Sequence, residues 1–114
     1  MIAQQFGLDL IVRMFRSTEL RVVPIVTRAE ECDVPDEYML YGRPIDRFSH
    51  AVAALRDMCD EISRRRRSGI VLPRVIVSVS NPDALILRSP GGEVAELLDI
   101  LARDGEDFGI ELVA

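Results

Sequence analysis

The chain contains no lysine and no tryptophan, a single histidine and only two cysteines. One histidine without a Cys-x-x-Cys pair does not supply the usual ligand set of a zinc site. Aromatic residues make up 5% of the chain. That is too few for the stacking platforms that bind single-stranded nucleic acid, so we do not expect nucleic acid as a partner. Two cysteines do not form the disulfide framework of a small secreted domain.

Several motifs of catalysis, cofactor binding and membrane insertion are also missing. The sequence has no Walker A loop and no Gly-x-Gly-x-x-Gly, and it has neither an apolar run of membrane-spanning length nor a secretion signal. His50 and Cys59 fall on one predicted helix, where nine positions separate them by about 13 Å, too far for a catalytic dyad. We therefore predict a cytoplasmic protein without catalysis, metal or cofactor.

The 114 residues predict one domain spanning 1–114. Composition is 48% hydrophobic and 29% charged, which is typical of a globular chain with an aliphatic core. The net charge of −5 is unevenly distributed. Residues 1–45 hold five arginines and seven acids, residues 46–69 hold six arginines and four acids, and residues 70–114 hold three arginines and eight acids. Only the middle segment is basic.

Hydrophobic periodicity predicts three helices. Phe6, Leu10 and Met14 recur at helical spacing over residues 3–16. Residues 46–67 carry the clearest stripe, with Asp46 as the expected N-cap and Gly69 as the stop. A third helix is predicted over residues 91–104, with an apolar face that includes Val94, Leu97, Leu98 and Leu101.

Strands are predicted over residues 20–27, 38–42, 74–80, 84–88 and 108–112. Pro24 favours an edge position or a bulge for the first strand. Asn81-Pro82-Asp83 is typical of a turn that would join the third and fourth strands as a hairpin. The predicted order is α-β-β-α-β-β-α-β. We expect an α/β (α+β) single-domain sandwich, with a mixed sheet of four or five strands packed by two main helices.

Residues 38–113 follow an order of strand, helix, strand, glycine-bearing turn, helix and strand. This order resembles the core of anti-sigma-factor antagonist (STAS-type) domains, which gives a STAS-like pattern as the alternative fold. The turn that carries a phosphorylatable Asp-Ser-Ser-Gly in that family is Arg88-Ser89-Pro90-Gly91 here.

The most unusual motif is the run of arginines from Arg64 to Arg67 at the end of the middle helix. Cations at a helix C-terminus interact favourably with its dipole, and Asp60–Arg64 and Glu61–Arg65 have the spacing of i,i+4 ion pairs. This reading makes the run a solvated helix end. One functional alternative is a patch that binds an anion or nucleic acid, and another is a contact for an acidic partner surface. One such surface is the acidic cluster Glu30, Glu31, Asp33, Asp36 and Glu37, in the same chain or in another copy.

Ser89-Pro90-Gly91-Gly92 precedes the last predicted helix, with Ser89 as the expected N-cap and Pro90 in the first turn. Backbone N–H groups at Gly91 and Gly92, together with Ser89, could also hold an anion. The tetrapeptide resembles the Ser-Pro-Gly-Gly turn of Clp-type and signal-peptide-peptidase-type serine proteases. Their nucleophilic serine comes well downstream of this turn, whereas no serine follows Ser89 here, so we do not expect protease activity.

Together these observations predict a small, non-catalytic protein-interaction or regulatory module that binds another protein or a second copy of itself. The residues expected at the contact are Arg64, Arg65, Arg66 and Arg67. One alternative is an anion- or nucleotide-binding protein that uses Gly91, Gly92 and the arginines. Another is an accessory subunit of a larger enzyme.

Overall fold

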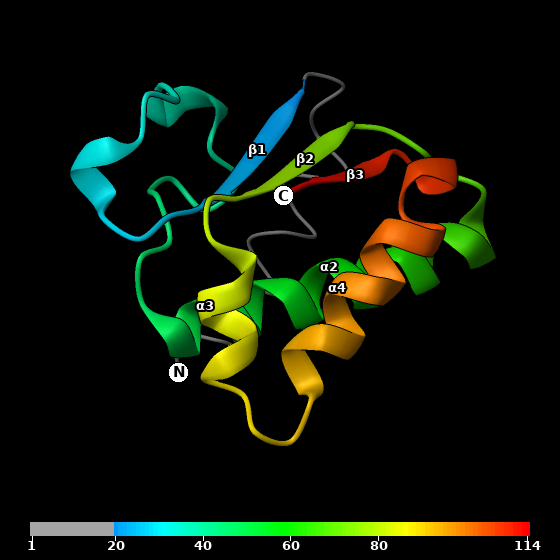
Figure 1. Cartoon of the computed structure of the whole chain (residues 1–114). Coiled ribbons are helices and arrows are strands. Elements are labelled where there is room, and N and C mark those ends of the chain that lie inside the picture. Colours follow the sequence, from blue (N-terminus) through cyan, green and yellow to red (C-terminus); the bar gives the residue numbers. More distant parts are fainter. Residues whose placement is uncertain (1–19) are drawn as a thin grey trace.

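The computed structural model describes residues 20–114, and the helix expected over residues 3–16 lies outside them. Figure 1 shows a small sheet with its helices gathered on one side. The strands are β1 (Arg21–Ile25), β2 (Val75–Val79) and β3 (Ile110–Val113). The helices are α2 (Phe48–Ser68), α3 (Pro82–Leu87) and α4 (Glu93–Asp104), and three 3₁₀ turns complete the list: η1 (Ala29–Glu31), η2 (Asp36–Tyr38) and η3 (Glu106–Phe108).

The sheet is parallel throughout, in the order β1-β2-β3. A parallel neighbour requires the chain to cross back over the sheet, usually as a helix. Helix α2 makes this crossing between β1 and β2, and α3 and α4 make it between β2 and β3. Because successive crossovers of one hand in sequential strand order fall on the same face, all three helices cover that face (Figure 1).

The core lies between this face and the helices. Strand β2 alternates strictly, with three buried valines separated by half-buried Ile76 and Ser78, as one covered face requires. The core is aliphatic, as the composition predicts. It includes Val23, Ile25, Val75, Val77, Val79, Leu55, Met58, Ile62, Val94, Leu98, Leu101 and Ile110.

Helices α2 and α4 pack side by side and run in the same direction. Arg56 pairs with Glu93 near the start of α4. Farther along, the Cys59 thiol donates a hydrogen bond of 3.6 Å to the Leu97 carbonyl. These contacts place the carboxyl ends of both helices together, at the amino ends of the strands.

The predicted mixed sheet of four or five strands is wrong, because residues 20–114 form a sheet of three parallel strands with three helices packed on it. The hairpin strand expected over residues 84–88 belongs instead to α3. The Asn81 side chain accepts a hydrogen bond of 3.2 Å from the Ala84 backbone N–H, and Pro82 occupies the first turn. A type I turn has the backbone conformation of a first helical turn, so the same residues serve both structures.

The strand expected over residues 38–42 is also absent, and with it the STAS-like order. Tyr38 ends η2, and Met39 forms an isolated bridge with Val22 in place of a strand. The segment still follows the outer edge of β1, where the Ile45 N–H donates to the Pro24 carbonyl at 2.8 Å. Pro24 therefore lies at the edge of the β1-β2-β3 ladder, as predicted, where its missing N–H removes no bond to β2.

Two helix starts differ from the prediction. Helix α2 begins at Phe48 with Arg47 rather than Asp46 as its N-cap, and α4 begins at Glu93 with Gly92 rather than Ser89. The Ser89 hydroxyl still accepts a hydrogen bond of 3.3 Å from the Val94 N–H, so it satisfies an early donor of α4 from outside the helix. The predicted stop of α2 at Gly69 is confirmed, in a left-handed conformation with φ 76°.

Candidate functional site

The arginine run divides at Arg65, whose side chain is buried with 1% of its surface exposed. Its Nε donates to Glu61 at 3.0 Å. Its Nη1 and Nη2 donate to the carbonyls of Phe108 and Pro73, both at 2.7 Å. One planar cation thus joins α2 to the loop before β2 and to η3. The predicted Glu61–Arg65 pair is present, but it is internal, and this guanidinium does not reach the surface.

The other three arginines lie outside this network to different degrees. Arg64 is half-buried and pairs with Glu61 rather than with the expected Asp60. Arg66 lies 3.7 Å from Asp104 and stacks over the Phe108 ring at 5.2 Å from its centroid. Arg67 is exposed and makes no ion pair within residues 20–114. The surface that the run offers to a partner consists of Arg64, Arg66 and Arg67, and that contact stays a prediction.

Next to these arginines is a surface that the sequence did not single out. Ile70, Val71 and Leu72 are consecutive aliphatic residues with exposed fractions of 40%, 45% and 46%. Their loop is fixed at both ends, since the Ser68 hydroxyl accepts from the Ile70 N–H and the Pro73 carbonyl accepts from Arg65. We call this surface the basic apolar end; it comprises Arg64, Arg66, Arg67, Ile70, Val71 and Leu72.

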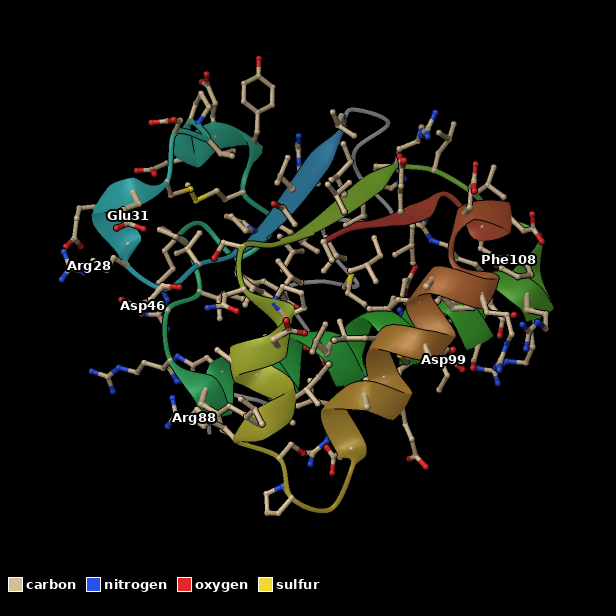
Figure 2. All side chains as sticks on the ribbon, in the orientation of Figure 1. Arg28, Glu31, Asp46, Arg88, Asp99 and Phe108 are labelled. Atoms are coloured by element: carbon tan, nitrogen blue, oxygen red, sulfur yellow. The ribbon has the colours of Figure 1, made fainter. Side chains whose placement is uncertain are left out.

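The acidic cluster occupies the other side of the molecule. Glu30, Glu31, Asp36 and Glu37 lie in η1 and η2, with Asp33 between them. Figure 2 shows Arg28 and Glu31 far from Phe108, which lies under Arg66 at the basic apolar end. The two charged surfaces therefore do not pair within one chain. We call the acidic surface the acidic end; it comprises Glu30, Glu31, Asp33, Asp36, Glu37 and Tyr38, whose ring is exposed.

The structure does not bring Gly91 and Gly92 to the arginine run. Gly92 precedes the first turn of α4, whereas Arg66 pairs with Asp104 at the last residue of that helix. Twelve residues of α-helix separate these positions by about 18 Å. The anion site expected at Ser89, Gly91 and Gly92 stays a prediction, but the serine hydroxyl already accepts from Val94.

A separate cleft lies at the carboxyl ends of β1 and β2. Its volume is about 120 Å³, and its polar lining consists of Thr27, Asp46, Ser80, Asn81 and Arg88. Buried Ile25 and Val79 contribute the ends of the two strands. Arg88 stacks over the Phe48 ring at 4.8 Å from its centroid. These polar residues follow two strands, precede α2 or end α3, and only the parallel pairing of β1 with β2 brings them together.

Two side chains of α2, Asp57 and Cys59, have a raised pKa. The Tyr41 hydroxyl donates to Asp57 at 3.1 Å. Burial raises the pKa of the Asp57 carboxyl, although the hydrogen bond from Tyr41 opposes the shift. Burial also raises the pKa of the Cys59 thiol, to about 11. A thiol that is protonated at neutral pH is a poor nucleophile, so Cys59 does not suit nucleophilic catalysis.

Comparison of the chain with protein-family models, with curated proteins and with solved structures finds no match. In the described part of the chain, no helix combines the length and the apolar character needed to cross a membrane. Residues 20–114 also contain no cluster of three or more histidine, cysteine, aspartate or glutamate side chains that could hold a metal ion.

Proposed function

We propose that the protein is a small, non-catalytic interaction module that associates head to tail with further copies of itself. The basic apolar end of one copy would bind the acidic end of the next. The observation that carries this proposal is the loop Ile70-Val71-Leu72, which holds three aliphatic side chains in water beside exposed guanidinium groups. The cytoplasm is the proposed compartment, in keeping with two cysteines that are both free.

The physical argument begins with the exposed loop. Contiguous apolar surface rimmed by polar groups is typical of interaction sites, and arginine is enriched at such interfaces. Burying the exposed half of each aliphatic side chain would contribute roughly 1 kcal/mol. The loop is already ordered by Arg65 and Ser68, so association would lose little conformational entropy there.

The occupant is inferred from charge complementarity. The acidic end carries five carboxylates, with Tyr38 as an exposed ring beside them. Opposite charges on opposed surfaces orient an encounter and fix its register. Because the two ends are different surfaces of one molecule, the contact is heterologous, and it generates a ring or an open chain rather than a two-fold dimer.

Sedimentation velocity over a range of protein concentrations tests this proposal. We expect species larger than the monomer to grow with concentration and to diminish at high salt, which screens the charged rim. Val71→Asp should block the basic apolar end, and Glu37→Arg should block the acidic end. Each variant alone should be monomeric, but an equimolar mixture should form a heterodimer, because each partner keeps one intact end.

A matched control is Leu87→Asp, which places a charge on an apolar side chain that is 83% exposed on α3, away from both ends. It should leave association unchanged. A wild-type protein that stays monomeric at the highest concentration reached would contradict head-to-tail association. So would a two-fold dimer that the mixed variants fail to restore. In either case, the basic apolar end would serve a different partner, such as the catalytic subunit of a larger enzyme.

A further inference from the structure

The cleft at the carboxyl ends of β1 and β2 is separate from both interaction surfaces. It is bounded by the two strand ends, by the start of α2 and by α3. In parallel α/β proteins, ligand sites lie outside the carboxyl ends of the strands rather than at their amino ends. Its volume of about 120 Å³ suits a small metabolite rather than a nucleotide.

The guanidinium of Arg88 is held against an aromatic ring but makes no ion pair in the described part of the chain. In this it differs from most of the other arginines there. Arg56, Arg64, Arg65, Arg66, Arg74 and Arg103 each contact a carboxylate. Arg88 instead stacks on the ring of Phe48 at 4.8 Å. Stacking restrains the guanidinium plane and leaves its N–H edges available for a planar anion such as a carboxylate.

The cleft also contains an uncompensated anion. Asp46 is exposed and makes no ion pair within residues 20–114, so it does not pair with Arg88 across the cleft. Figure 2 shows both residues on the same side of the molecule. Thr27 and Ser80, which carry hydroxyls, and Asn81, which carries an amide, also line the cleft. The Asn81 oxygen already accepts from Ala84, which leaves the amide N–H₂ as a donor.

We propose that this cleft binds a small zwitterion of amino-acid size. Arg88 and the Asn81 amide would hold its carboxylate, and Asp46, with a neighbouring hydroxyl, would accept from its ammonium group. The two protein charges select for a ligand that carries both complementary charges. A nucleotide phosphate would meet Arg88 favourably, but it would be repelled by Asp46 in the same small volume.

Titration followed by ¹⁵N–¹H NMR tests the proposal, with the backbone amides of Thr27, Ser80 and Asn81 as reporters. The probes are glycine, alanine and serine. Their single-charge analogues are propionate, which lacks the ammonium group, and ethylamine, which lacks the carboxylate. We expect saturable shifts at these amides with at least one amino acid, and at least tenfold weaker binding of both analogues.

Two variants separate the contributions of the two charges. Arg88→Ala and Asp46→Asn should each weaken amino-acid binding at least tenfold. Both side chains are exposed, so neither variant should unfold the domain. Arg103→Ala is the matched control, because Arg103 is also exposed but lies near the end of α4, outside the cleft and outside both interaction surfaces. It should leave binding unchanged.

Three results would overturn the proposal. The first is the absence of saturable shifts with any of the amino acids. The second is amino-acid binding that Arg88→Ala leaves intact. The third is a preference for inorganic phosphate over amino acids that Asp46→Asn strengthens, since this would show a simple anion site. None of these results bears on head-to-tail association, which sedimentation measures separately.

Discussion

Replacing Arg65 should destabilise this domain more than replacing any other arginine of the run. The side chain is buried, and its three donor groups contact Glu61, Phe108 and Pro73. Arg65→Ala removes the buried one of the two arginines that pair with Glu61, whose residue is 97% buried, and it removes the donors from two backbone carbonyls. Removing one member of a buried ion pair costs about 3–5 kcal/mol.

We therefore expect the free energy of unfolding to fall by about 4 kcal/mol, a large part of the 5–15 kcal/mol typical of a domain. For a chain of this size, that loss lowers Tm by about 15 °C. Urea unfolding at low temperature, followed by circular dichroism, measures the change. The stability of Arg65→Lys should lie between those of the wild type and of Arg65→Ala, because one ammonium group does not reproduce a planar guanidinium that donates to three separate acceptors.

Arg67→Ala is the control, since this arginine is exposed and unpaired within residues 20–114. The free energy of unfolding of this variant should stay within about 0.5 kcal/mol of the wild-type value. If Arg65→Ala fails to fold, two other variants are measured in its place. They are Arg65→Met and the double variant that combines Arg65→Met with Glu61→Leu. The double variant removes both buried charges and should be more stable than Arg65→Met. A loss below about 1 kcal/mol for Arg65→Ala would refute the assignment of Arg65 as the internal link.

Three further predictions concern a glycine, a carboxyl group and a thiol. Gly109 has φ +78°, and a Cβ there would overlap the carbonyl oxygen of Val71, so Gly109→Ala should cost about 2–4 kcal/mol in chemical unfolding. Gly91→Ala, with open space around it, should be nearly neutral; equal losses for the two variants would contradict this account. The pKa of Asp57 is raised, so its ionised form is disfavoured in the folded state, and the stability tied to its protonated form is lost as pH rises through the folded pKa. Asp57→Asn should thus show no gain over the wild type below the ordinary pKa of an aspartate, should gain stability as pH rises from there through the folded pKa, and should keep the full gain above it, a trend that urea unfolding from pH 3 to pH 7 checks. At pH 8, a Cys59 thiol with a pKa of about 11 is ionised to about one part in a thousand. In a Cys32→Ser variant, alkylation by iodoacetamide should therefore be slow and should accelerate about tenfold per pH unit, and a fast reaction at pH 8 would contradict the raised pKa.

The sequence predicts the long local elements well because their signals are local. The apolar stripe of α2 and its stop at Gly69 need only helical spacing and a residue that accepts positive φ. The alternation in β2 likewise needs only a period of two. Helix α4 is found with its start displaced by two residues, because Ser89 caps Val94 from outside the helix.

The arrangement of the strands is predicted less well, because pairing depends on distant contacts. Asn81-Pro82-Asp83 supports both a turn and a helix start, and only the neighbourhood of residues 84–88 decides between them. The short apolar run over residues 38–41 suggests a strand. The segment instead runs beside β1 with a few irregular bonds, such as Leu40 N–H to the Val22 carbonyl at 2.9 Å.

The candidate cleft shows the same limit more sharply. Asp46, Ser80 and Arg88 belong to no common motif, since the first precedes a helix, the second follows a strand and the third follows a short helix. Their proximity follows from the parallel pairing of β1 with β2, which places the carboxyl ends of both strands at one edge. The hairpin predicted at Asn81 places residues 84–88 in a strand beside β2 instead of in a helix. The error in the strand pairing therefore also conceals the cleft.

The arginine run shows why charge counting alone is insufficient. Four consecutive residues on a helix point in four directions about 100° apart. When one face of the helix packs on the core, at least one of four consecutive cations therefore points inward. In α2, the inward position is Arg65, four residues after Glu61 and seven after the buried Met58. Its burial orders the loop that exposes Ile70 and Leu72. The residue least available to a partner is therefore the one on which the proposed contact surface depends, and Arg65→Lys should weaken head-to-tail association even where the domain stays folded.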